Sequence, residues 1–159
     1  MAFCPLDYRY GSQDFKDFWS ERGRHERQIE VERALIWAHW QMGKVTEEDY
    51  RIIESISNPE DVTKERVSEI EAQTKHDIMA LTKAMAEAAG DAGWCIHLGA
   101  TSNDIVDTAV ALQLRDSIVL LKNSLKKLIK QTAELADREK ATVMLGRTHG
   151  QAAVPITFG

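Results

Sequence analysis

Two polar clusters in this sequence hold side chains that could bind or turn over a small anionic molecule. The first opens a long amphipathic stretch and runs from Thr101 to Asp107, and the second is the glycine-flanked run Arg147-Thr148-His149. A histidine titrates at about pH 6.5 and can give or take a proton at neutral pH. A helix start rich in hydroxyls and amides offers N–H donors and a positive dipole end to a carboxylate or phosphate. The two clusters therefore indicate an enzyme with an anionic ligand.

Each cluster also has a structural interpretation. Thr101 or Ser102 could cap a helix by accepting a backbone N–H, and this function is compatible with anion binding. Asp104 and Asp107 favour the helix dipole, so we interpret them as structural residues. His149 could be a loop histidine bonded to backbone, but its arginine and glycine neighbours favour a crowded anionic site.

Two shorter motifs could contribute to the same site. Lys75 and His76 could be anion ligands, with Asp77 orienting the imidazole, or the three could form a solvated helix face with a local charge pair. Arg9 offers a fork of donors to phosphate and Tyr10 adds a phenol, or both could pack the chain terminus against a helix. The remaining histidines are predicted to be surface or packing residues: His25, His39 and His97.

Composition restricts the class of protein. With 43% hydrophobic and 28% charged residues in 159, the chain should fold as a globular domain. The net charge of −5 argues against general nucleic-acid binding, which needs a clustered basic face. We expect a cytoplasmic protein, since no apolar run approaches the roughly 20 residues of a membrane span and no signal-peptide pattern follows Met1. We expect no bound metal, because neither an H-E-x-x-H motif nor a carboxylate-rich loop occurs, and Cys4 and Cys95 should be reduced thiols.

Hydrophobic periodicity predicts an all-α fold. The first helix should run over 22–42, end at Gly43 and bury one apolar face: Val31, Ala34, Leu35, Ala38 and Met42. Thr46 and Asp49 resemble a capping pair that starts a helix to about residue 55. Another helical run should extend from 63 to 90 with a kink at 74–76, and a glycine-containing loop over 91–100 should lead to Thr101.

The longest predicted helix covers 102–137, which contains neither proline nor glycine. At 1.5 Å per residue it would span roughly 50 Å, more than the roughly 30 Å of a compact domain of this size, so it should pack in a helical bundle. Residues 142–145 should be extended before a turn at 147–149, and Pro155 would suit the first turn of a further helix. The repeating face of the long helix is Leu121, Leu125, Leu128, Thr132 and Leu135.

In chain order, these motifs resemble those of the adenylosuccinate lyase family, within the fumarase and aspartase superfamily. The resemblance runs nearly end to end and is closest to the archaeal-type branch. It is carried by Arg9-Tyr10-Gly11-Ser12, Glu30-Val31-Glu32, Lys75-His76-Asp77, Ile96 to Ala109, Gly146-Arg147-Thr148-His149-Gly150 and Pro155 to Gly159.

The resemblance implies a β-elimination without metal or cofactor, which releases fumarate from adenylosuccinate, giving AMP, and from the succinyl-carboxamide ribotide of purine synthesis. It makes His149 the general acid and places Thr101 and Ser102 on the succinyl carboxylate, with Thr148 nearby. The nucleotide part of the site would be lined by Arg9, Tyr10, Lys75, His76 and Asp77. It also implies an N-terminal helical domain over 1–100, with an irregular arm at 1–12, and the start of the central helical bundle over 101–159.

The chain departs from the family in length. Family members are more than twice as long, and their general base is a serine on a loop of S-S-x-M-P-x-K-x-N-P type, which this sequence lacks. We therefore expect an N-terminal portion of an enzyme whose sites each form from three subunits of a homotetramer. The portion alone should have essentially no lyase turnover and should associate through the Leu121 to Leu135 face.

Two alternatives stay open. A carboxymuconate cycloisomerase-like enzyme would share the hydroxyl cluster, although it is less similar at Arg9-Tyr10 and at Thr148-His149. A non-catalytic helical interaction domain would use the long helix to pair with partners and the polar clusters only as caps.

Overall fold

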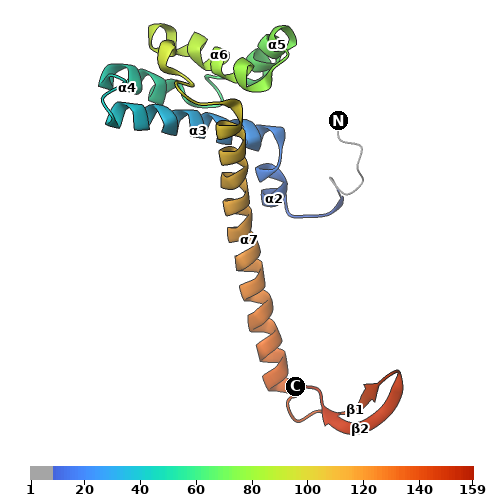
Figure 1. Ribbon diagram of the computed structural model, residues 1–159. Helices are drawn as coiled ribbons and strands as arrows, with labels where there is room; N and C mark the ends of the chain where they lie inside the picture. The colour runs from blue at the N-terminus through green and yellow to red at the C-terminus, as the bar shows by residue number, and fades with distance from the viewer. Residues whose placement is uncertain (1–8) are drawn as a thin grey trace. The chain divides into compact units, whose positions relative to one another are not determined.

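The structure is a computed structural model that describes residues 9–159 (Figure 1). Its contacts divide the chain after Ser117 into two units, and helix α7 (Ser102–Glu139) contributes to both. The described residues are mostly helical, with one two-stranded sheet, which confirms the all-α fold class. The domain boundary expected between residues 100 and 101 stays a prediction.

The helices predicted over 22–42 and 46–55 lie close to the observed ones. The helix Gln13–Phe18 was not predicted, and neither was the 3-10 helix Gly90–Cys95, which lies largely in the loop expected over 91–100. Helices build the first unit. In chain order they are α2 (Gln13–Phe18), α3 (Glu21–Gln41), α4 (Glu47–Ile56), α5 (Lys64–Thr74), α6 (Asp77–Ala89), the 3-10 helix η1 (Gly90–Cys95) and the first part of α7. The run predicted over 63–90 is two helices that separate at Lys75 and His76. Within the predicted arm, residues 1–8 lie outside the described part of the chain.

Side-chain caps explain where these helices begin. Thr46 Oγ1 accepts the Asp49 N–H at 3.1 Å and donates to the Asp49 carboxylate at 2.9 Å, which confirms the capping pair. Hydroxyls of the N-cap residues also accept backbone N–H groups at three other helix starts: Ser12, Ser20 and Thr63. Gly43, at φ 70°, follows α3 in the left-handed conformation that glycine favours, as the sequence predicts.

The buried face of α3 differs from the predicted one. Ala34 and Met42 are exposed, whereas the buried residues are His25, Gln28, Ile29, Val31, Glu32 and Ile36. Half of this buried set is polar, so a pattern that counts only apolar residues assigns the wrong face. Two of the polar members contact loops: His25 lies 2.7 Å from the Val62 carbonyl, and Glu32 forms hydrogen bonds with His97.

One of three core clusters sets the geometry of the candidate site. Val31 of α3, Ile78 in the first turn of α6, and Ile105 and Ala109 of α7 pack together, and each is at most 9% exposed. Ala100 packs against the same cluster. Because Ile78 and Ile105 each lie within four residues of a helix start, this cluster holds the beginnings of α6 and α7 near each other.

The second unit, from Ile118 onward, combines the rest of α7 with a β-hairpin. Strands β1 (Val143–Thr148) and β2 (Gln151–Thr157) pair antiparallel, with a register shift between Leu145 and Arg147. The extended segment over 142–145 and the turn are confirmed, but the helix expected at Pro155 is wrong because Pro155 lies in β2 opposite Leu145. A two-stranded sheet has only edge strands, which tolerate the missing N–H of proline.

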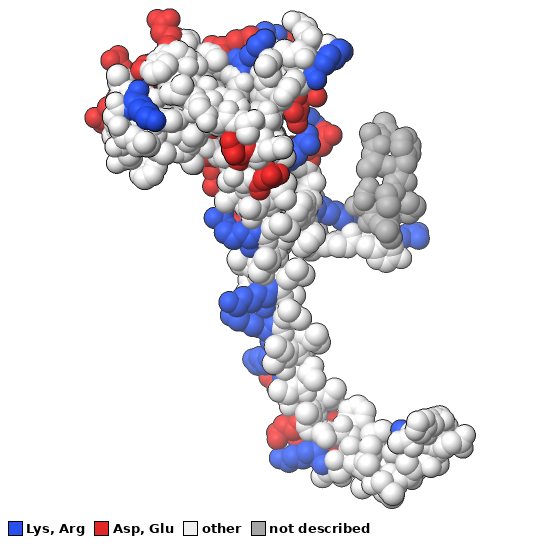
Figure 2. All heavy atoms as spheres, in the orientation of Figure 1, with Lys and Arg blue, Asp and Glu red and all other residues white. Residues whose placement is uncertain are grey.

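The α7 segment of the second unit exposes both leucine and lysine side chains. Within this unit, the predicted leucine face is open, with Leu121, Leu125 and Leu128 each more than half exposed. Lysine side chains also follow one another along this helix (Figure 2): Lys122, Lys126, Lys127 and Lys130.

Candidate active site

The junction between α5 and α6 presents His76 in a defined orientation. Lys75 ends α5 in the left-handed conformation, at φ 56°, and its N–H donates to the Glu71 carbonyl at 2.8 Å. His76 is extended and caps α6, because its Nδ1 accepts the Met79 N–H at 3.3 Å. A ring nitrogen that accepts a hydrogen bond carries no proton, so the proton of the neutral imidazole lies on Nε2.

Ser102 lies next to this imidazole. Its Oγ is 3.4 Å from His76 Nε2, and with the tautomer above the imidazole donates while the hydroxyl oxygen accepts. The hydroxyl hydrogen of Ser102 can then point to a further acceptor. The structure thus brings together two candidate residues that belong to different motifs of the sequence.

The same contact joins the N-termini of two helices, because His76 caps α6 and Ser102 is the first residue of α7. Each N-terminus carries a partial positive charge and outward N–H groups, so their meeting point favours an anion. Part of the α7 start is already capped, since Asp104 Oδ2 accepts the Thr101 N–H at 2.9 Å. This bond uses the N–H of Thr101 itself, and Thr101 is exposed.

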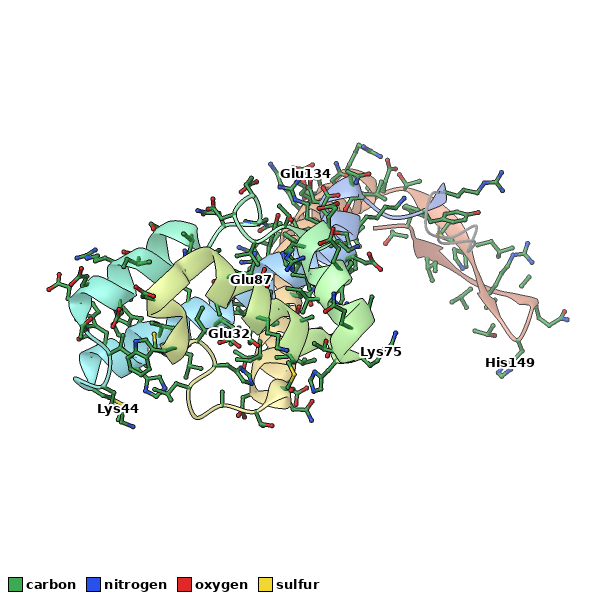
Figure 3. All side chains as sticks on the ribbon, turned by 90° about the horizontal axis from the view of Figure 1, so that it is seen from above. Glu32, Lys44, Lys75, Glu87, Glu134 and His149 are labelled. Atoms are coloured by element: carbon green, nitrogen blue, oxygen red, sulfur yellow. The ribbon has the colours of Figure 1, made fainter. Side chains whose placement is uncertain are left out.

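Asp77 and Lys75 stand beside this meeting point with different contacts. Asp77 Oδ1 accepts the Ile78 N–H at 2.8 Å and lies 3.6 Å from His76 Nδ1, which is too far for a hydrogen bond. Lys75 extends from the edge of the first unit, where Figure 3 labels it. Arg9 and Tyr10 are exposed, and their proposed contact with a nucleotide stays a prediction.

His149 and Thr148 belong to the second unit, where they form the hairpin end (Figure 3). His149 at φ 50° and Gly150 at φ 74° are the two turn residues between the paired residues Thr148 and Gln151. Two successive residues with positive φ define a tight turn of the type that matches the twist of a hairpin. The imidazole is therefore presented at the tip of an ordered hairpin.

A buried ion pair near the start of α7 was missed by the sequence interpretation, which assigned His97 to the surface or to packing. Glu32 is fully buried, and its Oε1 lies 2.6 Å from His97 Nδ1 while its Oε2 accepts the His97 N–H at 3.2 Å. Burial raises the pKa of the Glu32 carboxyl, and the contacts with His97 oppose that rise. The sequence holds no signal for this pair, since 65 positions separate its members.

Residues 9–159 contain neither a cluster of metal ligands nor a helix that could span a membrane. In this range, no three His, Cys, Asp or Glu side chains gather as the ligands of a metal ion would. None of the helices described is both long enough and apolar enough to span a bilayer.

Comparison with known proteins supplies the family of this fold. A family model described as Lyase matches residues 9–159. Adenylosuccinate lyase from Archaeoglobus fulgidus is 52% identical over 159 residues, which are all of this chain and 35% of that protein. A solved fumarate lyase from Mesorhizobium sp. BNC1 has a TM-score of 0.85 and 32% identity, covering 94% of this chain and 36% of that one.

A solved β-carboxy-cis,cis-muconate cycloisomerase from Acinetobacter calcoaceticus sp. ADP1 is also similar. Its TM-score is 0.86 at 25% identity, over 96% of this chain and 37% of that chain. The chain thus spans about a third of the length of the proteins that it matches.

Proposed function

Because the chain belongs to the lyase family, whose model it matches from residue 9 to residue 159, we propose that it forms the N-terminal part of an adenylosuccinate lyase. The enzyme would release fumarate from adenylosuccinate, giving AMP, and from the succinyl-carboxamide ribotide of purine synthesis. It would be cytoplasmic. The 52% identity to the Archaeoglobus fulgidus adenylosuccinate lyase over the whole chain supports this choice within the family.

The observation that carries the proposal is the 3.4 Å approach of His76 Nε2 to Ser102 Oγ at two helix N-termini. Elimination of fumarate begins with loss of a weakly acidic proton beside a carboxylate, which builds negative charge on that carboxylate. Helix N-termini and a serine hydroxyl stabilise such charge without a basic side chain. In this proposal Ser102 and Thr101 hold the succinyl carboxylate.

The other candidate residues take the remaining roles. His149 acts as general acid and protonates the departing purine nitrogen as the carbon–nitrogen bond breaks, with Thr148 beside it. The general base would be a serine from a part of the enzyme beyond this chain. Residues on the nucleotide would be Arg9, Tyr10, Lys75, His76 and Asp77, and each site would combine residues from three subunits of a homotetramer.

A chimera provides the test. Residues 1–159 replace the matching 35% of the Archaeoglobus fulgidus relative, and release of fumarate from adenylosuccinate is followed by absorbance. We expect turnover by the chimera and essentially none by the 159-residue chain alone. A chimera that assembles like the parent relative, as judged by sedimentation and thermal unfolding, but leaves adenylosuccinate intact contradicts the proposal.

Similarity to the muconate cycloisomerase supports a second candidate, an enzyme that acts on a carboxymuconate. The two are separated by substrate, since the cycloisomerase has no use for a purine nucleotide. AMP and adenylosuccinate should each raise the melting temperature of the chimera, whereas carboxymuconate should not.

The exposed leucine face of α7 supports a third reading, a non-catalytic helical interaction domain. Neither AMP nor adenylosuccinate would change the melting temperature of a chimera that contains such a domain. The substitutions His149→Ala and Ser102→Ala would not alter this result.

A further inference from the structure

We propose that Glu32 is a positioning residue that holds the loop before α7, and through it Ser102, in the geometry that binds the substrate carboxylate. This inference rests on the proposed function. Glu32 lies on α3, and its hydrogen bonds within residues 9–159 go to His97 and not to a residue assigned to the substrate, so it acts through His97 and the loop from His97 to Ala100.

Both oxygens of the Glu32 carboxylate contact one residue of this loop. Oε2 accepts the backbone N–H of His97, and Oε1 lies 2.6 Å from the ring Nδ1. A carboxylate that is 0% exposed is costly to bury unless it is paired and hydrogen-bonded. Since His97 supplies both partners, release of the loop would leave the charge unpaired, and the loop is thereby held to α3.

A second residue of α3 holds the same loop. His39 Nε2 lies 2.7 Å from the Leu98 carbonyl, which can only accept, so Nε2 carries the proton. Among residues 9–159, none forms a hydrogen bond with the buried Nδ1 of His39. His39 follows Glu32 by seven residues, about two helical turns, so one face of α3 contacts two consecutive loop residues.

The loop needs this support because its backbone is unusual. His97 has φ 61° and Gly99 has φ 73°, and the left-handed conformation is sparsely populated by residues other than glycine. Surrounding contacts are required to maintain such a conformation at a non-glycine residue. The double contact of Glu32 with His97 supplies them at the position where they are needed.

The consequence reaches Ser102 through a short connection. Ala100 packs on the cluster of Val31, Ile78 and Ile105, and Ser102 follows two residues later. Val31 therefore holds the starts of α6 and α7 together, and the adjacent Glu32 fixes how the chain enters α7. Without the Glu32 contact, the 3.4 Å approach of Ser102 to His76 would lose its support on the loop side.

Glu32→Gln tests the proposal in the chimera with little change in size. Glu32 uses a different carboxylate oxygen for each contact with His97, and in the amide one of these oxygens becomes an NH2 group, which donates and cannot accept an N–H. We expect faster hydrogen–deuterium exchange over residues 97–104. We also expect the KM for adenylosuccinate to rise roughly tenfold, with a smaller change in kcat, because a displaced Ser102 weakens carboxylate binding.

His25→Gln is the matched control. His25 is also a buried polar residue of α3 and also bonds a loop, through the Val62 carbonyl, but that loop joins α4 and α5. This variant should lower the melting temperature and leave both the exchange of residues 97–104 and the KM unchanged. Equal effects of the two variants on exchange and KM would overturn the proposal, as would unaltered exchange and KM after Glu32→Gln.

His97→Asn is the second variant, used if Glu32→Gln fails to fold. Asparagine tolerates positive φ and keeps the backbone N–H for Glu32 but removes the ring contact. We expect faster exchange over residues 97–104 and a higher KM, both by less than in Glu32→Gln. The absence of these changes overturns the proposal. If the unmodified chimera shows no turnover, the proposed function fails, while the exchange of residues 97–104 still decides whether Glu32 holds the loop.

Discussion

Ser102 Oγ lies 3.4 Å from His76 Nε2, across 26 positions of sequence, at the place where helices α6 and α7 begin. His76 caps α6 through Nδ1, which leaves its protonated Nε2 directed at the serine hydroxyl. One imidazole therefore serves both the local helix and the candidate site. Capping and the serine contact use different ring nitrogens. Substitutions of His76 can therefore remove the serine contact and either keep or remove the cap.

Ser102→Ala should weaken substrate binding in the chimera. Loss of a hydrogen bond to a charged group costs about 1.5–3 kcal/mol, equivalent to a fall in kcat/KM of roughly 10–100-fold. Steady-state fumarate release measures the change. Ser55→Ala makes the same substitution at an exposed position of α4 and should retain full activity, so a comparable loss in both variants would contradict a specific role for Ser102.

His76→Ala and His76→Asn should differ in stability but not in their effect on the serine. Asparagine can cap α6 and alanine cannot, so only the alanine variant should lose about 1 kcal/mol of unfolding free energy. Both lose the contact with Ser102 and should raise the KM. Urea unfolding and kinetics measure the two effects, and equal stability of the two variants would show that the imidazole contributes nothing as a cap.

His149→Asn should remove proton transfer while preserving the hairpin. Asparagine is favoured before glycine in a turn with two positive φ values, and His149 and Gly150 occupy such a turn. Loss of a general acid should lower kcat roughly 10²–10⁴-fold. Melting temperature and assembly should match the unmodified chimera. A kcat within a few-fold of that enzyme would assign proton transfer to another group.

The stability of the chain should fall as pH rises through the titration of Glu32. Burial raises the pKa of this carboxyl above its ordinary value of 4.5, so the folded state binds a proton more readily than the unfolded state does. Between those two pKa values the free energy of unfolding therefore decreases with increasing pH, and below the unfolded value this contribution is constant.

The Glu32→Gln variant lacks this titration and provides the comparison. The free energy of unfolding of both proteins is measured in urea over a series of pH values from 4 upward. This free energy should decrease less with increasing pH in the variant. Subtraction of the two curves removes most contributions from groups outside the contact of Glu32 with His97. Parallel curves would show that Glu32 titrates alike in the folded and unfolded states.

The local sequence was sufficient to predict most helices and the residues that end them. The capping pair of Thr46 and Asp49, the end of α3 at Gly43 and the long α7 all follow from interactions within a few residues. The hydroxyl cluster could be identified as a helix start for the same reason. Pro155 shows the limit of such rules, because pairing with β1 across the hairpin outweighs its preference for a helix start.

The amino-acid sequence by itself determined where the helices lie and which polar residues could carry chemistry, because capping, turn formation and hydrophobic periodicity act over a few residues. Only the tertiary structure decided that Ser102 meets His76, that half of the buried residues of α3 are polar and that Glu32 contacts His97. Those contacts join positions 26 and 65 residues apart, and they depend on how side chains pack in the core formed by Val31, Ile78 and Ile105.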